Sequence, residues 1–577
     1  MSFGAEDPAV EASVPPEDLP DLPAPLVSPA EVEIDSNGAA GPASAPTPEP
    51  PEPEPAPPEP SEPEPSEPKP PEPKPPEPEP PAVDDEVVPE QTVRFSAPPQ
   101  FRLLDLGGVA HDVVATTADQ RTLVTVYLDT PDLRLVRWGA ELRHRAGAGW
   151  TVRLPQRAGS GPPRVVHFTG PPSTPPPEAV GLLTAYVRSA PLRPVARLRT
   201  ARRRVLLQTN EGRRLAEIDD DEVSVLDGRR VAGRFREVEV DVADGAPRAL
   251  LTAIVERLHA AGCGVVRPAP KLVRALGARA ADPAEVVLLE VGRESPAADA
   301  VRRAIGASVL RALEHDAGLR LDLEPEDVHQ ARVATRRLRS DLRTFAPLVE
   351  PAFGEPLREE LRWLAEELGA VRDAEVLAMR LRVRAAALPG TDAAVGLRIV
   401  SALDAAVDAA RTELAATIRT PRYVALLDRL VAAAQAPELT ELAAHPAADV
   451  CPELVAIPWR KLRKAVGQLG DEPADEALHQ IRIHAKRCRY AAEAVAPVLG
   501  RRAGAFARAA ASLQEVLGEF HDAVVAAEWL RAHGRRGVRN AFVAGELHAQ
   551  ELSVAQHGRE HWAQAYKRLR REWPNWS

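Results

Sequence analysis

The alternation of apolar and charged residues divides the chain into a strand-rich part and a helical part. In the strand-rich part, residues 93–280, short runs place charged and apolar residues at alternate positions, which puts the charges on one face of a sheet. These runs are residues 123–128, 141–145, 150–154, 202–207, 213–219 and 235–241. Turns rich in Gly and Pro separate them, and one helix, residues 247–261, is predicted to close this part.

Residues 296–572 are predicted to be almost wholly helical. They are rich in Ala, Leu, Arg and Glu, and only short Pro and Gly breaks interrupt them. Residues 281–295 are the expected linker between the two parts.

A basic helical segment occurs twice in the helical part, about 150 residues apart. Each copy begins with a histidine and carries cations three, seven, eight and ten residues later. The first copy contains His329, Arg332, Arg336, Arg337 and Arg339, and the second contains His479, Arg482, Lys486, Arg487 and Arg489. A repeat of this length predicts a duplicated structural unit, with copies at about residues 296–436 and 451–572.

Helical geometry separates a cationic stripe from an apolar one on these segments. At 100° per residue, five side chains fall within roughly 80° of one another: His329, Arg332, Arg336, Arg339 and Arg343. The opposite side carries Ala331, Ala334, Leu338, Leu342 and Phe345. A solvated surface helix is one interpretation. The cationic stripe has no interleaved acids and is duplicated, however, which favours a binding face for an anion with many charges.

Charge is distributed unevenly along the chain. The formal net charge is −12, yet residues 1–90 hold 23 Asp and Glu against two Lys, so the remainder is net basic. The same 90 residues hold 29 of the 60 prolines. We therefore predict a disordered, acidic, Pro-rich tail at residues 1–92, in extended polyproline II conformation. Its role would be that of a spacer or solubiliser, or of an acidic arm that competes for the basic face.

Cysteines and targeting signals indicate a cytoplasmic protein. Cys263, Cys451 and Cys488 lack CxxC spacing, which predicts free thiols in a reducing compartment and gives no support for zinc. The N-terminus has no basic and apolar signal segment, and no run of about 18 apolar residues is present. Walker loops, dinucleotide-binding glycine motifs and nucleophile elbows are also absent from the sequence.

The strand-rich part places acids and bases where they could share one interior. Alternating positions put Arg143 with Arg145, and Arg202 with Arg204, on one face, and Arg153 lies on a further strand. Two acidic pairs alternate likewise: Glu217 with Asp219, and Glu237 with Glu239. A barrel lined with both kinds of side chain would hold a polyphosphate, with Arg on the oxygens and carboxylates on Mg²⁺ or Mn²⁺. The alternative is that these charges face solvent on an antiparallel sheet.

At this point the chain resembles two families. Residues 127–135, 141–145, 150–155, 236–241 and 270–276 resemble a CYTH domain, a member of the triphosphate tunnel metalloenzymes. Residues 328–339 and 478–490 resemble a CHAD domain. The resemblance implies a multidomain α+β fold, in which an antiparallel β-barrel or tunnel precedes an all-α domain of two four-helix repeats. It also implies a basic cavity that binds inorganic polyphosphate.

The resemblance assigns roles to individual residues. Both copies of the basic segment and Arg343 would bind polyphosphate, as would the basic residues Lys461, Arg463 and Lys464 before the second copy. By resemblance, phosphate contacts in the tunnel would come from Arg143, Arg145, Arg153 and Lys271, and the alternation along the strands adds Arg202 and Arg204. The carboxylate side, and any metal, would involve Glu217, Asp219, Glu237 and Glu239.

One departure from the family pattern bears on catalysis. CYTH enzymes open with a Glu-x-Glu-x-Lys strand, whereas residues 93–105 contain no such motif and their first acid is Asp105. Because Mg²⁺ demands near-octahedral oxygen ligands, we expect triphosphate hydrolysis to be poor or absent.

Three functions are compared. The preferred prediction is an inorganic polyphosphate-binding protein that needs no cofactor and associates with polyphosphate granules. The alternatives are a metal-dependent triphosphatase acting through the CYTH-like part and nucleic-acid binding by the same basic face. Aromatic residues make up only 4% of the chain, which argues against recognition of single strands.

Overall fold

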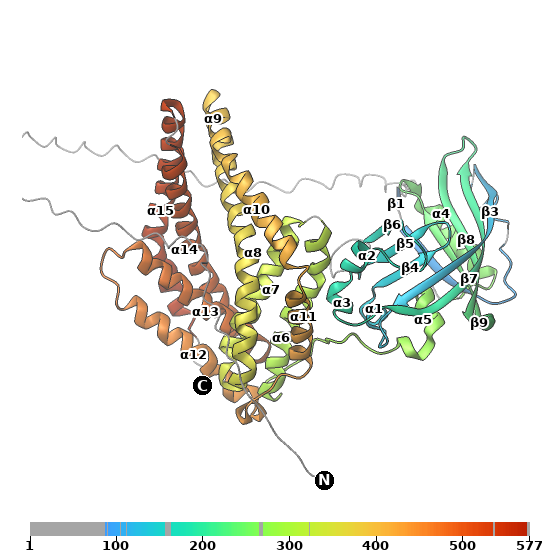
Figure 1. Ribbon diagram of the computed structural model, residues 1–577, viewed down its shortest axis with the longest axis horizontal. Coiled ribbons are helices and arrows are strands. Elements are labelled where there is room, and N and C mark those ends of the chain that lie inside the picture. Colours follow the sequence, from blue (N-terminus) through green and yellow to red (C-terminus); the bar gives the residue numbers. More distant parts are fainter. Residues whose placement is uncertain are drawn as a thin grey trace, which may run out of the picture. The chain divides into compact units, whose positions relative to one another are not determined.

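The computed structural model describes residues 87–88, 91–103, 105–110, 112–155, 163–264, 269–321, 323–534 and 537–573. Almost all of the tail predicted for residues 1–92 lies outside the described residues, so its predicted disorder is not tested. Figure 1 shows the strands of the strand-rich part and the long helices of the helical part.

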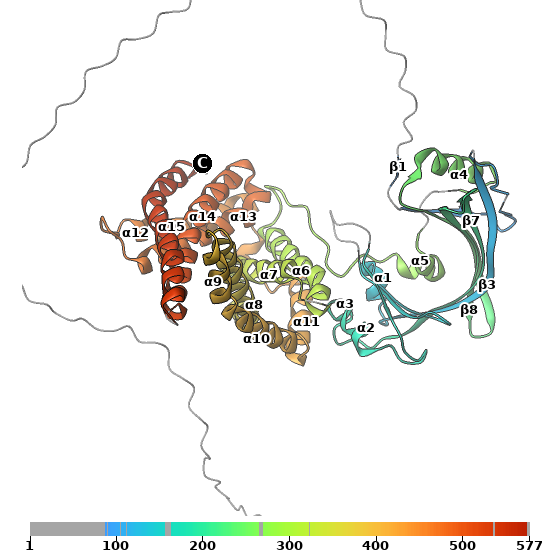
Figure 2. The same ribbon diagram turned by 90° about the horizontal axis from the view of Figure 1, so that it is seen from above.

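An eight-stranded antiparallel sheet forms the strand-rich part, in the order β2-β9-β8-β7-β3-β4-β5-β6. Its strands are β2 (Gln91–Ala97), β3 (Val113–Asp129), β4 (Glu141–Arg145), β5 (Gly149–Arg153), β6 (Val165–Phe168), β7 (Arg193–Thr209), β8 (Arg214–Asp227) and β9 (Arg230–Val242). A separate two-stranded sheet pairs β1 (Val87–Val88) with β10 (Ala246–Pro247). In the described residues the edge strands β2 and β6 are not paired with each other, so the sheet is not closed by hydrogen bonds. Figure 2 shows that it is strongly curved.

Alternation along the strands gives the curved sheet two chemically different faces. Phe95, Ile218 and Val240 are fully buried in a hydrophobic cluster that includes helix α4 (Arg248–Ala260). Their neighbours along the strands, such as Arg94 and Glu239, point to the opposite face because successive side chains alternate. Helix α5 (Lys271–Leu276) lies on the concave side of the curve (Figure 2). The remaining helices of this part are α1 (Arg134–Trp138), α2 (Pro177–Gly181), α3 (Thr184–Val187) and the 3₁₀ turn η1 (Gly277–Ala280).

The helical part contains helices α6 to α15. They are α6 (Ala297–Leu321), α7 (Pro325–Thr344), α8 (Pro351–Ala386), α9 (Thr391–Val400), α10 (Ala402–Thr417), α11 (Pro421–Gln435), α12 (Ala447–Val466), α13 (Asp475–Leu499), α14 (Arg501–His533) and α15 (Val538–Arg571). Two 3₁₀ turns, η2 (Ala346–Leu348) and η3 (Glu441–Ala444), connect helices of this part. Residues 281–295, the predicted linker, form neither helix nor strand.

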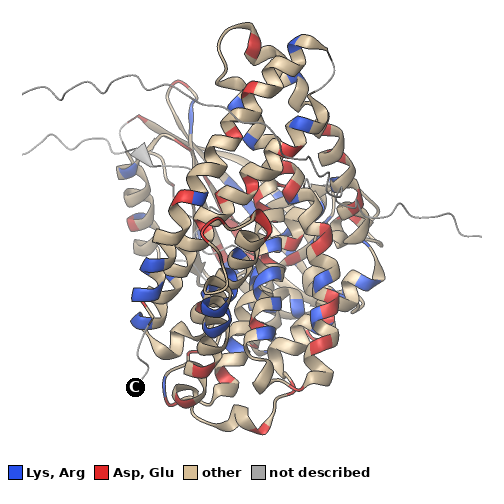
Figure 3. Cartoon of the chain, turned by 90° about the vertical axis from the view of Figure 1, so that its left-hand side faces the viewer, with Lys and Arg blue, Asp and Glu red and all other residues tan. Residues whose placement is uncertain are grey.

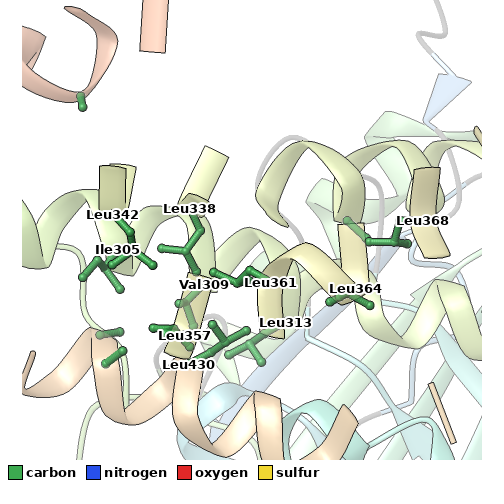
Figure 4. Close-up of a cluster of buried hydrophobic side chains, with 14 of the residues drawn as sticks. Ile305, Val309, Leu313, Leu338, Leu342, Leu357, Leu361, Leu364, Leu368 and Leu430 are labelled. Carbon is green, nitrogen blue, oxygen red and sulfur yellow. The ribbon is translucent and has the colours of Figure 1, made fainter. Parts of the chain in front are cut away.

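Duplication is visible in the positions at which helices begin. Helices α12, α13 and α14 begin 150 residues after α6, α7 and α8, and α15 spans the residues equivalent to α9 and α10. The apolar stripe predicted for the first basic segment is buried, including Ala334, Leu338 and Leu342. Figure 4 shows Leu338 and Leu342 packed with Ile305 of α6 and Leu357 of α8 in the core of the first repeat.

The predicted fold class is confirmed, because an antiparallel sheet is followed by an all-helical region. Among the described helices, none combines the length and the apolar composition required to span a lipid bilayer.

Candidate functional site

Local sequence explains why both basic segments are helical. Helix α7 has Pro325 at its first turn, where a missing N–H costs nothing, and Glu326 and Asp327 beside it complement the helix dipole. Helix α13 begins with Asp475 and Glu476, which likewise complement the helix dipole. The two helices pack against each other, which brings their cationic stripes into the same region of the domain.

Four cations, which we call the central cluster, interact across these two helices. They are Arg332 and Arg336 of α7, and Arg482 and Lys486 of α13. The pKa of Lys486 is lowered to about 8, by burial first and then by the charges of Arg482, Arg336 and Arg332, while Asp522 acts in the opposite direction. Burial likewise lowers the pKa of Arg482, with the charges of Arg336 and Arg332 adding to the effect. The central cluster is therefore a set of like charges held close together in a partly dehydrated place.

A large cavity opens between α6, α7 and α13. Its volume is about 680 Å³, and we call it the first cavity. Its basic lining residues are Arg303, Arg311, His329, Arg336, Arg337 and Arg489. Two acids, Asp341 and Glu493, line it as well, and both pair with Arg337. Cations thus outnumber acids on its walls.

Three of these arginines lie around the ring of Tyr490. The guanidinium carbons of Arg336, Arg337 and Arg489 lie 5.6–5.7 Å from the centroid of its ring, within the range of cation–π attraction. The side chain is only 6% exposed, and its hydroxyl has no hydrogen-bond partner in the described residues. Nothing in the basic repeat pointed to this residue, because the equivalent position of the first copy is a serine.

A smaller cavity of about 240 Å³, the second cavity, lies between the end of α7, η2, α12 and α13. Arg343, Lys461 and Arg487 line it together with mainly apolar residues. No acid lines it among the described residues.

Other predicted residues lie elsewhere. Arg339 lies near Arg358, Arg362 and Glu366 of α8, whose charges act on its pKa, although burial is the larger cause of its lowered value. Arg463 lies near Tyr566 of α15: burial raises the pKa of this tyrosine, and the charge of Arg463 opposes that rise. Lys464 is exposed.

The two predicted histidines differ in their surroundings. His329 lines the first cavity, and its pKa is lowered by burial and then by the charge of Arg372. His479 stacks against His521, with ring centroids 4.6 Å apart. Burial, followed by the charge of Arg482, lowers the pKa of His521.

Several buried nitrogen atoms of this region lack a partner. In the part of the chain that the structure describes, Nε of Arg336, Arg482 and Arg487 and Nδ1 of His479 accept or donate no hydrogen bond. A buried polar group without a partner is costly, and oxygen atoms of an anionic ligand would satisfy these donors. Figure 3 shows Lys and Arg, in blue, gathered on neighbouring helices of the helical part, with acidic residues among them.

The six predicted tunnel cations lie together on the concave face of the sheet. Arg143, Arg145, Arg153, Arg202, Arg204 and Lys271 all line one cavity of about 240 Å³, which we call the tunnel cavity. Three of the four predicted carboxylates line it too: Asp219, Glu237 and Glu239. Glu217 reaches the same region through its ion pair with Arg204, at 2.8 Å.

Acids and bases of the tunnel cavity neutralise one another. Arg202 forms two hydrogen bonds to Asp221, at 2.8 and 2.7 Å, and also pairs with Asp219. Lys271 bridges Asp221 and Glu237, at 2.7 and 2.9 Å. Arg145 differs, since burial, Arg143 and Arg202 all lower its pKa. Among the described residues, no group of three or more His, Cys, Asp or Glu is placed to hold a metal ion.

Strand β2 supplies a tunnel residue that the sequence analysis missed. Arg94 lines the tunnel cavity and pairs with Glu239 at 2.6 Å. Two residues earlier, Thr92 donates a hydrogen bond to Asp241. Polar Thr92 and Arg94 alternate with apolar Val93 and Phe95, a pattern typical of a strand. The predicted start of the strand-rich part at residue 93 left Thr92 out of this pattern. A threonine and an arginine therefore occupy the inward positions of this strand.

Comparisons with known proteins agree with this architecture. The sequence matches the CYTH domain over residues 93–261 and the CHAD domain over residues 303–531. It is 32% identical over 500 residues to the uncharacterized protein Rv2226 of Mycobacterium tuberculosis, which covers 80% of this chain and 92% of that protein. The uncharacterized protein MT2285, from another strain of that species, matches to the same extent.

Solved structures were also compared. PptA from Streptomyces chartreusis is 25% identical and covers 47% of this chain and 100% of its own, with a TM-score of 0.41. The CHAD domain from the plant Ricinus communis is 27% identical and covers 48% of this chain and 95% of its own, with a TM-score of 0.38. From its domains and its full-length relatives, the chain belongs to the family of CYTH–CHAD proteins that includes Rv2226.

Proposed function

We propose that the protein binds inorganic polyphosphate through the central cluster and the first cavity. The observation that carries this proposal is the mutual electrostatic coupling of Arg332, Arg336, Arg482 and Lys486 across α7 and α13. Such repulsion is relieved when a ligand brings many negative charges at short intervals. Each unit of a polyphosphate chain carries about one charge, and an arginine fork matches two phosphate oxygens. A protein that binds in this way would collect on polyphosphate granules.

Removal of three cations of the central cluster tests the proposal. We expect the folded full-length Arg336→Ala/Arg482→Ala/Lys486→Ala variant to bind long-chain polyphosphate at least about 100-fold more weakly, because hydrogen bonds to charged groups are worth roughly 1.5–3 kcal/mol each. Titration calorimetry at 150 mM salt is the measurement, with circular dichroism to verify helicity. Unchanged affinity in a folded variant would refute the assignment.

A matched variant controls for the loss of overall charge. Arg398 of α9, Arg429 of α11 and Arg531 of α14 are exposed and line neither cavity of the helical part. Their replacement by alanine removes the same three charges, and we expect affinity to change by about threefold or less. A loss equal to that of the central variant would mean that net charge, and not the cluster, governs binding.

Nucleic acid is the competing ligand of the same face. Single-stranded DNA offered at equal charge concentration and physiological salt should leave bound polyphosphate in place. Displacement at parity would favour the nucleic-acid alternative instead.

For the tunnel cavity, we propose a domain that hydrolyses triphosphate poorly or not at all. Two observations support this: its carboxylates are engaged by Arg and Lys, and the described inward positions of β2 are Thr92 and Arg94, neither of which is an acid. Phosphate release from tripolyphosphate, with Mg²⁺ or Mn²⁺ added, should stay below about 1 s⁻¹, a rate ordinary for enzymes. Faster turnover would favour the metal-dependent triphosphatase, with Mg²⁺ or Mn²⁺ held among Glu217, Asp219, Glu237 and Glu239.

A further inference from the structure

The two cavities of the helical part occupy equivalent places in the two repeats. An offset of 150 residues carries Ser340 onto Tyr490, Arg343 onto Glu493 and Pro347 onto Pro497. The same offset relates Lys461 to Arg311 and Arg487 to Arg337, and these two positions keep their positive charge. The cavities are thus at equivalent positions, and they differ in their side chains and in the turn η2, whose equivalent in the first cavity is part of helix α13.

Charge balance is the first difference. In the first cavity, Arg337 pairs with both Asp341 and Glu493. Its equivalent in the second cavity, Arg487, has Ala491 and Arg343 at the matching positions. One repeat therefore surrounds an arginine with two carboxylates, while the other replaces them with a methyl group and a second cation.

Arg487 consequently has no counter-ion of its own. Its Nε is buried without a hydrogen-bond partner, and no ion pair of Arg343, Lys461 or Arg487 occurs in the described residues. Burial lowers the pKa of Arg343, and the charge of Arg487 lowers it further. Burial lowers the pKa of His484, and the charges of Arg487 and Lys461 lower it further. Only Nε of Arg487 is buried, since the side chains of Arg343 and Lys461 are exposed. An external anion would accept a hydrogen bond from this Nε and neutralise the repulsion among the three cations.

The walls of the cavities form the second difference. Leu454, Ile457 and Pro458 of α12 line the second cavity, where the first has Ala304, Ala307 and Ser308. The larger apolar residues reduce the volume from about 680 to about 240 Å³. Ser340, in place of Tyr490, leaves open the space that an aromatic ring occupies in the other repeat. An apolar wall thus faces three cations across a small volume.

We propose that the second cavity binds a phosphate monoester that carries a compact apolar body. The body lies against Leu454, Ile457 and Pro458, and the phosphate binds Arg343, Lys461 and Arg487. Two arginine forks and one lysine suit a doubly charged phosphate, whereas a single arginine would match a carboxylate. Inorganic polyphosphate has no apolar part, so this ligand is different from that of the central cluster.

Binding of small phosphates to the full-length protein tests the proposal. The probes are inorganic phosphate, octyl phosphate, naphthyl phosphate and adenosine 5′-monophosphate, measured by titration calorimetry at equal ionic strength. At least one ester should bind about tenfold or more tightly than inorganic phosphate. Preference for the aromatic esters would identify a flat body, and preference for octyl phosphate would identify an acyl-type chain. Equal binding of all four probes would overturn the proposal.

Two variants transfer features of the first cavity to the second. Arg343→Glu supplies the carboxylate that Glu493 provides in the first repeat, and should weaken ester binding about 30-fold or more. Ser340→Tyr fills the apolar space and should abolish ester binding, while polyphosphate affinity stays within about threefold. Ester binding that survives both substitutions in folded protein would exclude this cavity.

The central-cluster variant separates this proposal from the proposed function. Arg336→Ala/Arg482→Ala/Lys486→Ala should lose polyphosphate and retain the ester. Loss of the ester in that variant, with polyphosphate retained, would contradict both assignments.

Discussion

The tunnel cavity and the central cluster are both rich in cations, but they differ in what balances those cations. In the tunnel cavity, Arg202 faces Asp219 and Asp221 across paired strands. In the central cluster, Arg336 faces Arg482 and Lys486 across packed helices. In the first arrangement most cations have a carboxylate partner, which contributes to the stability of the fold, although Nε of Arg143 and of Arg145 has no hydrogen-bond partner among the described residues. In the second arrangement Arg332 pairs with Asp373, whereas the other three cations lie among like charges, an arrangement that would favour an anionic ligand.

The pKa values of Arg202 in the tunnel cavity and Arg482 in the central cluster change in opposite directions. For Arg202 the pKa is raised, since hydrogen bonds and charges from Asp221 and Asp219 outweigh the lowering effect of burial. For Arg482 the pKa is lowered, since burial and neighbouring arginines outweigh the effect of Asp522. The same residue type is therefore stabilised in its charged form in one place and destabilised in the other.

The largest expected effect concerns stability. Arg202→Ala removes both hydrogen bonds from Arg202 to Asp221, which is 0% exposed, and leaves that carboxylate with Lys271 alone, while Asp219 keeps Arg204. It should lower the free energy of unfolding by about 3 kcal/mol. Arg482→Ala removes a repelled cation and should change it by about 1 kcal/mol or less. Urea denaturation followed by hydrogen exchange in each domain measures both. Equal losses of unfolding free energy in the two variants would mean that the tunnel cavity and the central cluster do not differ in how their charges contribute to stability.

Salt should affect the two regions unequally. If about five phosphates are neutralised in the central cluster and first cavity, polyphosphate affinity should fall about 100-fold between 50 and 200 mM salt, through counterion release from a single-stranded polyanion. Unfolding of the tunnel domain should hardly respond, because its ion pairs are shielded from solvent. Calorimetric titration and urea denaturation over the same salt series provide the test. A binding constant independent of salt would mean that few charges are in contact.

Sequence periodicity was sufficient for the cationic stripes but not for the pairing of charges. The apolar stripe of α7 and its cationic neighbours follow from helical geometry, and the buried Leu338 and Leu342 confirm it. That Arg204 lies opposite Asp219 depends on the register of β7 against β8, which long-range contacts set. Neither strand alone contains that information.

A helical wheel likewise does not show which neighbouring helix a side chain contacts. Arg339 and Arg463 share a basic sequence context with the central cluster, yet they lie near α8 and α15. Arg311 of the first cavity was missed, although the 150-residue offset from Lys461 would have identified it. Duplication in the sequence therefore contains more information about the site than composition does.

The next prediction uses the titration of Lys486. Since its pKa is lowered to about 8, this amine loses its proton as pH rises from 7 to 9, and polyphosphate affinity should fall by up to about tenfold per pH unit above 8. Bound phosphate favours the charged form, so binding takes up a proton in this window. Lys486→Arg should make affinity nearly independent of pH there, because arginine stays charged. Titration calorimetry in buffers of different ionisation enthalpy measures the proton uptake.

The same group gives stability a pH dependence of known sign. Its folded pKa lies below the ordinary value of 10.5, so the unfolded chain binds more protons between about pH 8 and 10.5. The contribution of Lys486 to the free energy of unfolding therefore increases as pH rises through that window. A Lys486→Arg variant with the same rise would assign it to another group.

The smallest expected effect comes from Glu493, which makes the first cavity partly resemble the tunnel. Its carboxylate pairs with Arg337 and accepts a hydrogen bond from Nε of Arg489 at 2.7 Å, so it competes with a phosphate for both arginines. Glu493→Gln keeps the shape, removes the negative charge and should raise polyphosphate affinity about two- to fivefold, since a half-buried ion pair is worth only about 0–1 kcal/mol. Competition binding against the unmodified protein resolves so small a change. Weaker binding in the variant would mean that Glu493 holds Arg337 and Arg489 in position for the ligand. The acid of the first cavity would then assist binding and not compete with the phosphate.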